Sequence, residues 1–292
     1  MELVDLSSSI ALRFGKWVSV NDVAEYILLR QNDDGGYTFA QWTDSSAQDT
    51  FFAVEVLKIL GVQPRKVREM AGFLKRLQHP DGSFDSVRVA YYVVKTLAGF
   101  GENPSLPVVD YILFLKREHG GFSGLEAFWD VPSEIEDTYL ALEVLREACN
   151  ESKLESTAEL ILKSQNKDGS FGKTNYSRIA STYYALASLK ILGYNVENFK
   201  ETLKWLRGME LPQGGFGEIY VNPEQYIGIE DVYFGVKALE ILNESLTHPK
   251  EALDLISQFR NNNGGFRRSN VLGISTFEAT YQAMAAMESI LT

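Results

Sequence analysis

QNDDGGY, residues 31–37, is the stretch that decides the fold, because related stretches recur along the whole chain. Each copy contains two glycines, or glycine and serine, followed by Tyr or Phe. The six copies contain Gly35-Gly36-Tyr37, Gly82-Ser83-Phe84, Gly120-Gly121-Phe122, Gly169-Ser170-Phe171, Gly214-Gly215-Phe216 and Gly264-Gly265-Phe266. A motif that returns every 38 to 50 residues predicts a protein built from repeats, each of which is too small to bury its own apolar face.

The segments on either side of each motif have the periodicity of helices. AELILKSQ (residues 158–165) precedes one copy, and TYYALASLKILG (residues 182–193) follows it. The glycines predict that the first helix ends in a tight turn with positive φ, and that the following aromatic ring fills the space between hairpins. Because the motifs look alike from first to last, without polar capping repeats, we predict an all-α (α/α)6 toroid of about six helical hairpins, forming one domain over residues 1–292.

Composition narrows the classes of function. The chain is 45% hydrophobic and 23% charged, which is typical of a globular protein, and no apolar run is long enough to span a membrane. We find no secretory signal and expect a cytoplasmic protein, with peripheral membrane contact left open. A net charge of −11 argues against nucleic acid as a partner. The single cysteine, Cys149, excludes an internal disulfide and any zinc site with two thiolates.

The motifs resemble those of a known superfamily over about residues 20–290. QNDDGGY, QHPDGSF (residues 78–84) and SQNKDGSFG (residues 164–172) resemble the Q-x-x-D-G-[GS]-[FW] repeat of squalene cyclases. HGGFSG (residues 119–124) and PQGGFG (residues 212–217) resemble the GGFxG repeat of protein prenyltransferase β subunits. The resemblance implies inner and outer helices around an aromatic-lined cavity that binds an isoprenoid or another hydrophobic small molecule.

Aligning the second helices of the repeats gives two columns of candidate substrate-binding residues. One column is aromatic throughout, and it is either a packing layer or a wall that binds a prenyl chain and stabilises a carbocation. Three positions before each aromatic residue, a second column varies in chemistry, as expected of side chains that face a ligand. The aromatic column is Phe51, Tyr91, Tyr139, Tyr183, Tyr233 and Tyr281, and the variable column is Gln48, Arg88, Glu136, Ala180, Glu230 and Glu278.

Aspartates beside the variable column have a simpler interpretation. Asp49, Asp137 and Asp231 are expected in the first turns of these helices, where a carboxylate stabilises the free backbone N–H groups.

The resemblance also indicates which chemistry to expect. In protein prenyltransferases an Asp, a Cys and a His bind zinc, and the nearest positions here are Gly228, Glu230 and Glu278, so we expect neither a zinc site nor protein prenylation. Arg267 and Arg268 are either a solvated rim or a binding site for an anionic head group.

An acidic motif suggests a proton donor. Residues 134–138, EIEDT, resemble the D-x-D-D-T motif of class II terpene cyclases. The resemblance implies that Glu136 is the catalytic acid, with Glu134 and Asp137 as its supports. Crowded carboxyl groups raise one another's proton affinity, whereas the helix amino terminus favours the charged form.

The leading hypothesis is therefore an isoprenoid-active enzyme of the class II cyclase type, without a required cofactor. One alternative is a non-catalytic toroid that binds a lipid or a peptide. Another is a glycan-active hydrolase or lyase, in which Trp42 and Trp129 would line a groove. The glutamates Glu136, Glu230 and Glu278 are also a candidate carboxylate cluster for binding Mg²⁺.

Overall fold

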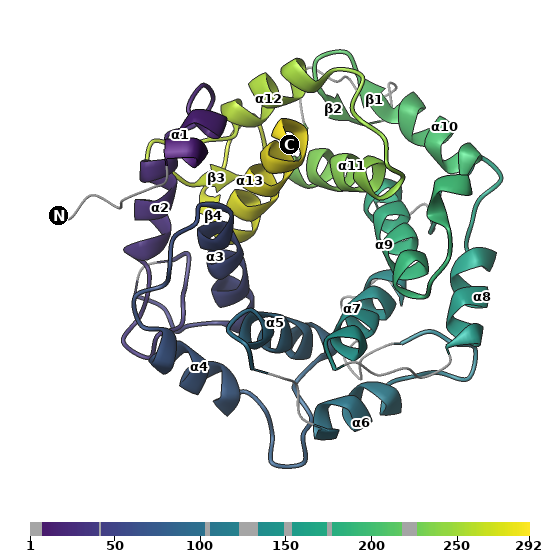
Figure 1. Ribbon diagram of the computed structural model, residues 1–292, viewed down its shortest axis with the longest axis horizontal. Helices are drawn as coiled ribbons and strands as arrows, with labels where there is room; N and C mark the ends of the chain where they lie inside the picture. Colours follow the sequence, from purple (N-terminus) through teal and green to yellow (C-terminus); the bar gives the residue numbers. More distant parts are fainter. Residues whose placement is uncertain are drawn as a thin grey trace. The chain divides into compact units, whose positions relative to one another are not determined.

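Helices dominate the computed structural model of the protein, and they alternate along the chain with glycine turns and a few two-residue strands (Figure 1). The structure describes residues 8–40, 42–102, 106–122, 134–148, 154–173, 177–217 and 227–292. Contacts between Cα atoms group the chain into unit 1 (residues 1–72, 206–240 and 244–292) and unit 2 (residues 73–205 and 241–243). This grouping does not test whether the chain is one domain, which stays a prediction.

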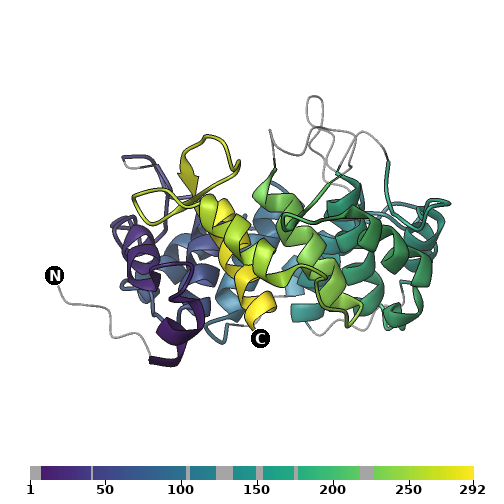
Figure 2. The same cartoon turned by 90° about the horizontal axis from the view of Figure 1, so that it is seen from above.

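Unit 1 contains the first repeats and the last ones. Its second helices α3 and α13 pack side by side, α2 packs on α3, and α12 packs on α13 (Figure 1). Its elements are α1 (Ser8–Phe14), α2 (Val20–Leu28), α3 (Ala47–Ile59), β1 (Glu210–Leu211), β2 (Gly215–Phe216), α11 (Ile229–Ile241), α12 (Pro249–Gln258), β3 (Phe266–Arg267), β4 (Ser275–Thr276) and α13 (Phe277–Leu291). The antiparallel strands β3 and β4 lie at the amino-terminal end of α13 (Figure 2).

Unit 2 contains the middle repeats. Its second helices α5, α7 and α9 pack in sequence order, with α6 on α7 and α8 on α9. Its elements are α5 (Val87–Ala98), α6 (Leu106–Phe114), α7 (Glu134–Glu147), α8 (Glu155–Lys163), α9 (Arg178–Ile191) and the 3₁₀ helix η1 (Val196–Asn198). Two further helices, α4 (Val67–Arg76) and α10 (Lys200–Met209), contribute residues to both units, and the last residue of α11, Ile241, belongs to unit 2.

Each glycine turn packs against the backbone of the first helix of the next repeat. Gly169 has φ of +93°, and a Cβ atom there would lie 2.4 Å from the carbonyl carbon of Glu201 in α10. The first glycine of every motif has φ between +84° and +103°. Such φ values disfavour any residue with a Cβ atom, and the close approach leaves no room for one. The predicted tight turns are thus confirmed.

The last repeat contacts the first repeat within unit 1. A Cβ atom on Gly264 would lie 2.2 Å from the carbonyl oxygen of Asp22 in α2. Arg260 forms an ion pair of 2.5 Å with the Asp22 carboxylate, and Trp17 Nε1 donates a hydrogen bond of 3.0 Å to Asp254. An open solenoid, in which each repeat touches only its sequence neighbours, lacks such a contact.

The polar residues of the motif hold the turn in shape. Asp168 Oδ1 accepts hydrogen bonds from the backbone N–H and the hydroxyl of Ser170, at 3.0 and 2.7 Å. Gln165 Nε2 donates to the carbonyl oxygen of Gly169 and to Thr202 Oγ1 in α10. The glutamine therefore joins its own turn to the next repeat, which explains its place in the motif.

A threonine joins each of four turns to the second helix of its own repeat. The backbone N–H of Phe171 donates a hydrogen bond of 3.0 Å to Thr182 Oγ1, and both residues are fully buried. The same bond links Tyr37 to Thr50, Phe122 to Thr138 and Phe266 to Thr280. The aromatic residues of all six motifs are at most 5% exposed, which confirms that they fill the space between hairpins.

Replacing Gly169 by Ala is expected to lower the free energy of unfolding by at least about 2 kcal/mol, because the new Cβ atom adds a backbone clash to an unfavourable φ. The control is Gly193→Ala in the same unit, because Gly193 has φ of +84° but no atom within 4 Å of the place that a Cβ atom would take. Urea unfolding should show a clearly smaller loss for the control. Equal losses would show that the contact with α10 is unimportant.

Replacing Thr182 by Val keeps the shape of the side chain but leaves the buried N–H of Phe171 without its acceptor. The expected loss is about 1–3 kcal/mol. Thr182→Ser keeps the hydroxyl and should lose less, although it removes a methyl group. Thermal and urea unfolding measure both variants, and a larger loss for Ser than for Val would contradict the role of the hydroxyl.

Candidate active site

Side-chain caps fix where four of the second helices begin. Ser46, Ser86, Ser177 and Thr276 each accept a hydrogen bond from the backbone N–H three residues later. The predicted variable column therefore lies in the first turns of these helices. The aspartates Asp49, Asp137 and Asp231 also lie in first turns, as predicted.

In unit 2 the first turns of α5 and α7 form a charged cluster. Arg88 Nη1 donates to Glu136 Oε1 at 2.6 Å, and Arg88 Nε lies 3.9 Å from Asp137 Oδ1. Burial lowers the pKa of Arg88, but the hydrogen bond and charge of Glu136, with the charge of Asp137, more than reverse this effect and raise the pKa above its ordinary value. Arg88 therefore stays cationic, and Glu136 is its closest anion.

Tyr184 in α9 completes the cluster. Its hydroxyl donates a hydrogen bond of 3.2 Å to the same oxygen of Glu136, Oε1. Arg88 and Tyr184 thus both bond to Oε1, and among the residues that the structure describes no hydrogen bond reaches Oε2 of Glu136. The Glu136 side chain is 20% exposed, whereas the Asp137 side chain is only 3% exposed.

Glu134 lies apart from this cluster. Its carboxylate contacts His119 Nε2 at 2.5 Å, and its side chain is 43% exposed. The acidic residues of the EIEDT motif thus divide, with Glu136 and Asp137 next to Arg88 and Glu134 next to the glycine turn. The contact between Glu134 and His119 does not test whether Glu134 supports Glu136, and that role stays a prediction.

Next to the charged cluster, three tyrosines of the aromatic column form a row. The ring centroids of Tyr91 and Tyr139 lie 6.4 Å apart, and those of Tyr139 and Tyr183 lie 5.8 Å apart. The hydroxyls of Tyr139 and Tyr183 are separated by 3.4 Å. Burial raises the pKa of the Tyr139 and Tyr184 hydroxyls well above 10, so both phenols are neutral and their ring faces keep the partial negative charge that attracts cations.

Tyr184 is not among the predicted site residues, although its hydroxyl bonds to Glu136 and its ring centroid lies 5.3 Å from that of Tyr139. A signal for it exists in the sequence. In four repeats the aromatic column is followed directly by a second aromatic residue, in the pairs Phe51-Phe52, Tyr91-Tyr92, Tyr183-Tyr184 and Tyr233-Phe234. Adjacent positions on a helix point about 100° apart, so the second ring reaches a neighbouring face of the same helix.

Unit 1 holds the other half of the aromatic column. The ring of Tyr281 in α13 lies 6.2 Å from Phe51 in α3 and 5.7 Å from Tyr233 in α11. Of the variable column, Gln48 Nε2 donates to Glu278 Oε2 at 3.4 Å. Glu230 instead forms an ion pair of 2.7 Å with Arg268.

The two arginines after the last glycine motif differ in their roles. The Arg267 guanidinium donates to the backbone carbonyl oxygens of Gln258, Arg260, Ser269 and Asn270 and to the Asn261 side chain. Arg267 therefore holds the loop between β3 and β4 in place. Arg268 is more exposed and bonds to Glu230.

Several other predictions concern metals and tryptophans. Within the described residues there is no group of three His, Cys, Asp or Glu side chains arranged to hold a metal ion.

Trp42 is 98% exposed and has φ of +70°. Trp129 and Cys149 lie outside the described residues. No helix in the described part of the chain is both long and apolar enough to cross a membrane.

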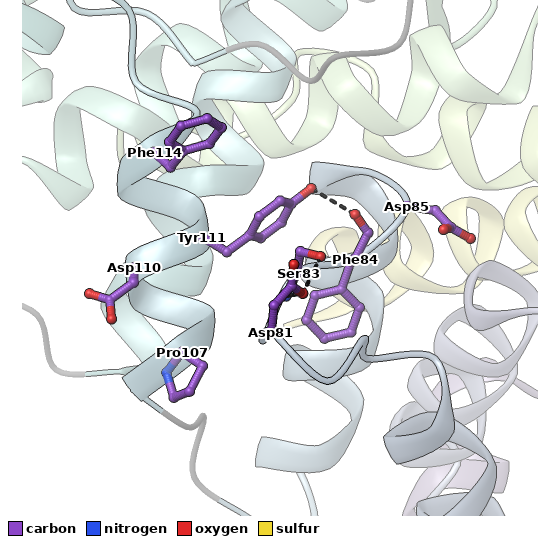
Figure 3. A pocket seen from close by; sticks show the side chains of 8 residues that line it. All are labelled: Asp81, Ser83, Phe84, Asp85, Pro107, Asp110, Tyr111 and Phe114. Carbon is purple, nitrogen blue, oxygen red and sulfur yellow. Dashed lines mark hydrogen bonds between the residues drawn. The ribbon is translucent and has the colours of Figure 1, made fainter.

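A pocket of about 550 Å³ lies elsewhere in unit 2, between the second glycine turn and α6 (Figure 3). Phe84, Tyr111 and Phe114 provide its aromatic surface, and the Tyr111 hydroxyl donates a hydrogen bond of 3.0 Å to the carbonyl oxygen of Phe84. None of the predicted site residues lines this pocket.

Comparisons with known proteins place this geometry in context. The sequence matches the family model described as prenyltransferase alpha-alpha toroid domain over residues 15–124, 85–175, 138–231 and 228–291. No curated protein matches the sequence.

Among solved structures, a variant of the type II terpene cyclase MstE from Scytonema in complex with merosterolic acid A is 12% identical, with a TM-score of 0.67 and 98% of each chain covered. Protein geranylgeranyltransferase-I from Candida albicans, complexed with GGPP, is 18% identical, with a TM-score of 0.67 over 93% of this chain and 91% of that chain. At such identities the likeness shows the fold alone. It confirms the predicted all-α toroid, and the family match shows that this chain belongs to the prenyltransferase alpha-alpha toroid domain family.

Proposed function

We propose that the protein binds an isoprenoid chain against the aromatic side chains of its second helices and cyclises it by protonation, with Glu136 as the acid. The observation that carries this proposal is the row of Tyr91, Tyr139 and Tyr183 beside Glu136. An apolar chain on such rings buries its hydrocarbon surface, and a carbocation formed from it meets the faces of neutral phenols.

The contacts of Glu136 define the chemistry that it would perform. Arg88 and Tyr184 both bond to Oε1, which fixes the position of the carboxyl group. A proton on Oε2 would pass to an alkene carbon or to an epoxide oxygen of the substrate. Arg88 would then stabilise the carboxylate that remains on Glu136. The arginine therefore favours the product side of the proton transfer. Solved structures of similar fold support the substrate class, because one MstE variant is described in complex with geranylgeranyl dihydroxybenzoate.

The same ion pair favours a second candidate function, a non-catalytic toroid that binds a lipid or peptide. The contact of 2.6 Å between Arg88 and Glu136 joins α5 to α7, and a structural ion pair of this kind needs no reaction to explain it. Asp137, which lies 3.9 Å from the same guanidinium, belongs to the same structural network of charges.

Replacing Glu136 by Gln separates the two candidates. The amide keeps the size of the side chain and can accept a hydrogen bond from Arg88, but it cannot donate a proton as an acid does. We expect cyclised product to fall by at least about 100-fold while prenyl binding is kept. Products from farnesyl, geranylgeranyl and squalene-type compounds would be analysed by gas chromatography–mass spectrometry, and binding by native mass spectrometry.

The matched control is Glu159→Gln on α8, where Glu159 is 66% exposed and pairs with Lys163. This variant should behave like the unmodified protein. Prenyl binding without any product in the unmodified protein would favour the non-catalytic candidate. Product formation that survives in Glu136→Gln would remove Glu136 from the mechanism, and a protein that binds no prenyl compound would overturn the proposal.

A further inference from the structure

The amino ends of the second helices carry more carboxylates than cations in each unit taken by itself. In unit 2, Glu136 and Asp137 lie next to one cation, Arg88. In unit 1, the first turns of α3, α11 and α13 carry Asp49, Glu230, Asp231 and Glu278. A helix amino terminus otherwise attracts an anionic ligand, but in α3, α7, α11 and α13 the protein's own carboxylates occupy the first turn.

The cations near these helix ends are bound within the protein. Arg88 bonds to Glu136, Arg178 bonds to Asp168, Arg268 bonds to Glu230, and Arg267 bonds to backbone carbonyl oxygens. A second charged cluster on α5 and α7 is also balanced, because Lys95 bonds to Glu143 and Glu147. An anionic ligand would have to take one of these cations from its present partner.

The sequence between the glycine turns and the second helices is poor in basic residues. Among all six joining segments the basic residues are Lys173, Arg267 and Arg268.

A diphosphate bound at these ends would therefore meet mainly like charge. Sites for phosphate groups use Arg, Lys or exposed backbone N–H groups, often with a metal ion that bridges carboxylates and phosphates. The described residues contain no group of three His, Cys, Asp or Glu side chains that could hold such an ion. A hydroxyl group, in contrast, can donate a hydrogen bond to a carboxylate without adding charge.

We propose that the ligand of this protein is a prenyl compound with an uncharged head group, such as an alcohol, a phenol or a hydrocarbon end, and not a prenyl diphosphate. The inference rests on the proposed function, since it specifies the substrate class of the same site. It also agrees with acid-initiated cyclisation, in which the proton adds to an alkene or epoxide and the head group is not expelled.

The test compares the affinity of the full-length protein for matched pairs of ligands. Farnesol would be compared with farnesyl diphosphate, and geranylgeraniol with geranylgeranyl diphosphate, by native mass spectrometry and tryptophan fluorescence titration, with and without Mg²⁺. We expect each alcohol to bind at least about tenfold more tightly than its diphosphate in both conditions, as repulsion between like charges at short range predicts.

The outcomes separate this inference from the proposed function. A diphosphate that binds more tightly than its alcohol, in either condition, would overturn the uncharged head group while still supporting isoprenoid binding. If diphosphates win only with Mg²⁺, the carboxylates bind that metal and the inference is likewise wrong. No binding of any of the four compounds would overturn the proposed function and this inference together.

A charge-reversal variant tests the cause of the preference. Glu134→Lys, at a partly exposed position in the first turn of α7, should shift the alcohol-to-diphosphate affinity ratio towards the diphosphate by about fivefold. Glu159→Lys on α8 makes the same change of net charge away from these helix ends and should leave the ratio unchanged. Equal shifts in both variants would show that overall charge, and not the charge at the helix ends, sets the preference.

Discussion

The close approach between each glycine turn and the backbone of the next repeat is the constraint on which the rest of the structure depends. At Gly35, Gly214 and Gly264 a Cβ atom would lie 2.1 to 2.2 Å from a backbone atom of the neighbouring helix. Contacts of this kind act between backbones, so the residues of the second helices are free to vary without changing the spacing of the repeats. The threonine bonds then fix each second helix to its own turn.

This arrangement separates the parts of the protein that hold the fold from those that face a ligand. The buried aromatic ring of each turn, such as Phe171, lies on the side where hairpins pack together. Tyr91, Tyr139 and Tyr184 are only half-buried, on helices that the turns hold in place. Side chains at equivalent positions of consecutive repeats become neighbours, and Arg88 and Glu136 meet for this reason.

The sequence was sufficient to predict the fold because the motif specifies a backbone conformation. Positive φ at the first glycine and a buried ring after it follow from the residue types alone. The site was predictable only in part. The variable column contains Arg88, Glu136, Gln48 and Glu278, which form two hydrogen-bonded pairs in the structure, but a repeat pattern does not reveal which of its side chains pair. Glu134 bonds to His119, and Glu230 bonds to Arg268, because local loops bring those partners close.

The ion pair between Arg88 and Glu136 also bears on how an apolar ligand could lie beside charged groups. Covering a lone carboxylate with hydrocarbon removes its water and costs several kcal/mol. Covering a hydrogen-bonded pair costs less, because the attraction between the two charges strengthens as water leaves. Tyr184 supplies a further hydrogen bond to Glu136, so part of the lost hydration is already replaced. A prenyl chain can therefore lie over this cluster more easily than over an isolated acid, whereas an anionic head group would compete with Glu136 for Arg88 and lose that advantage.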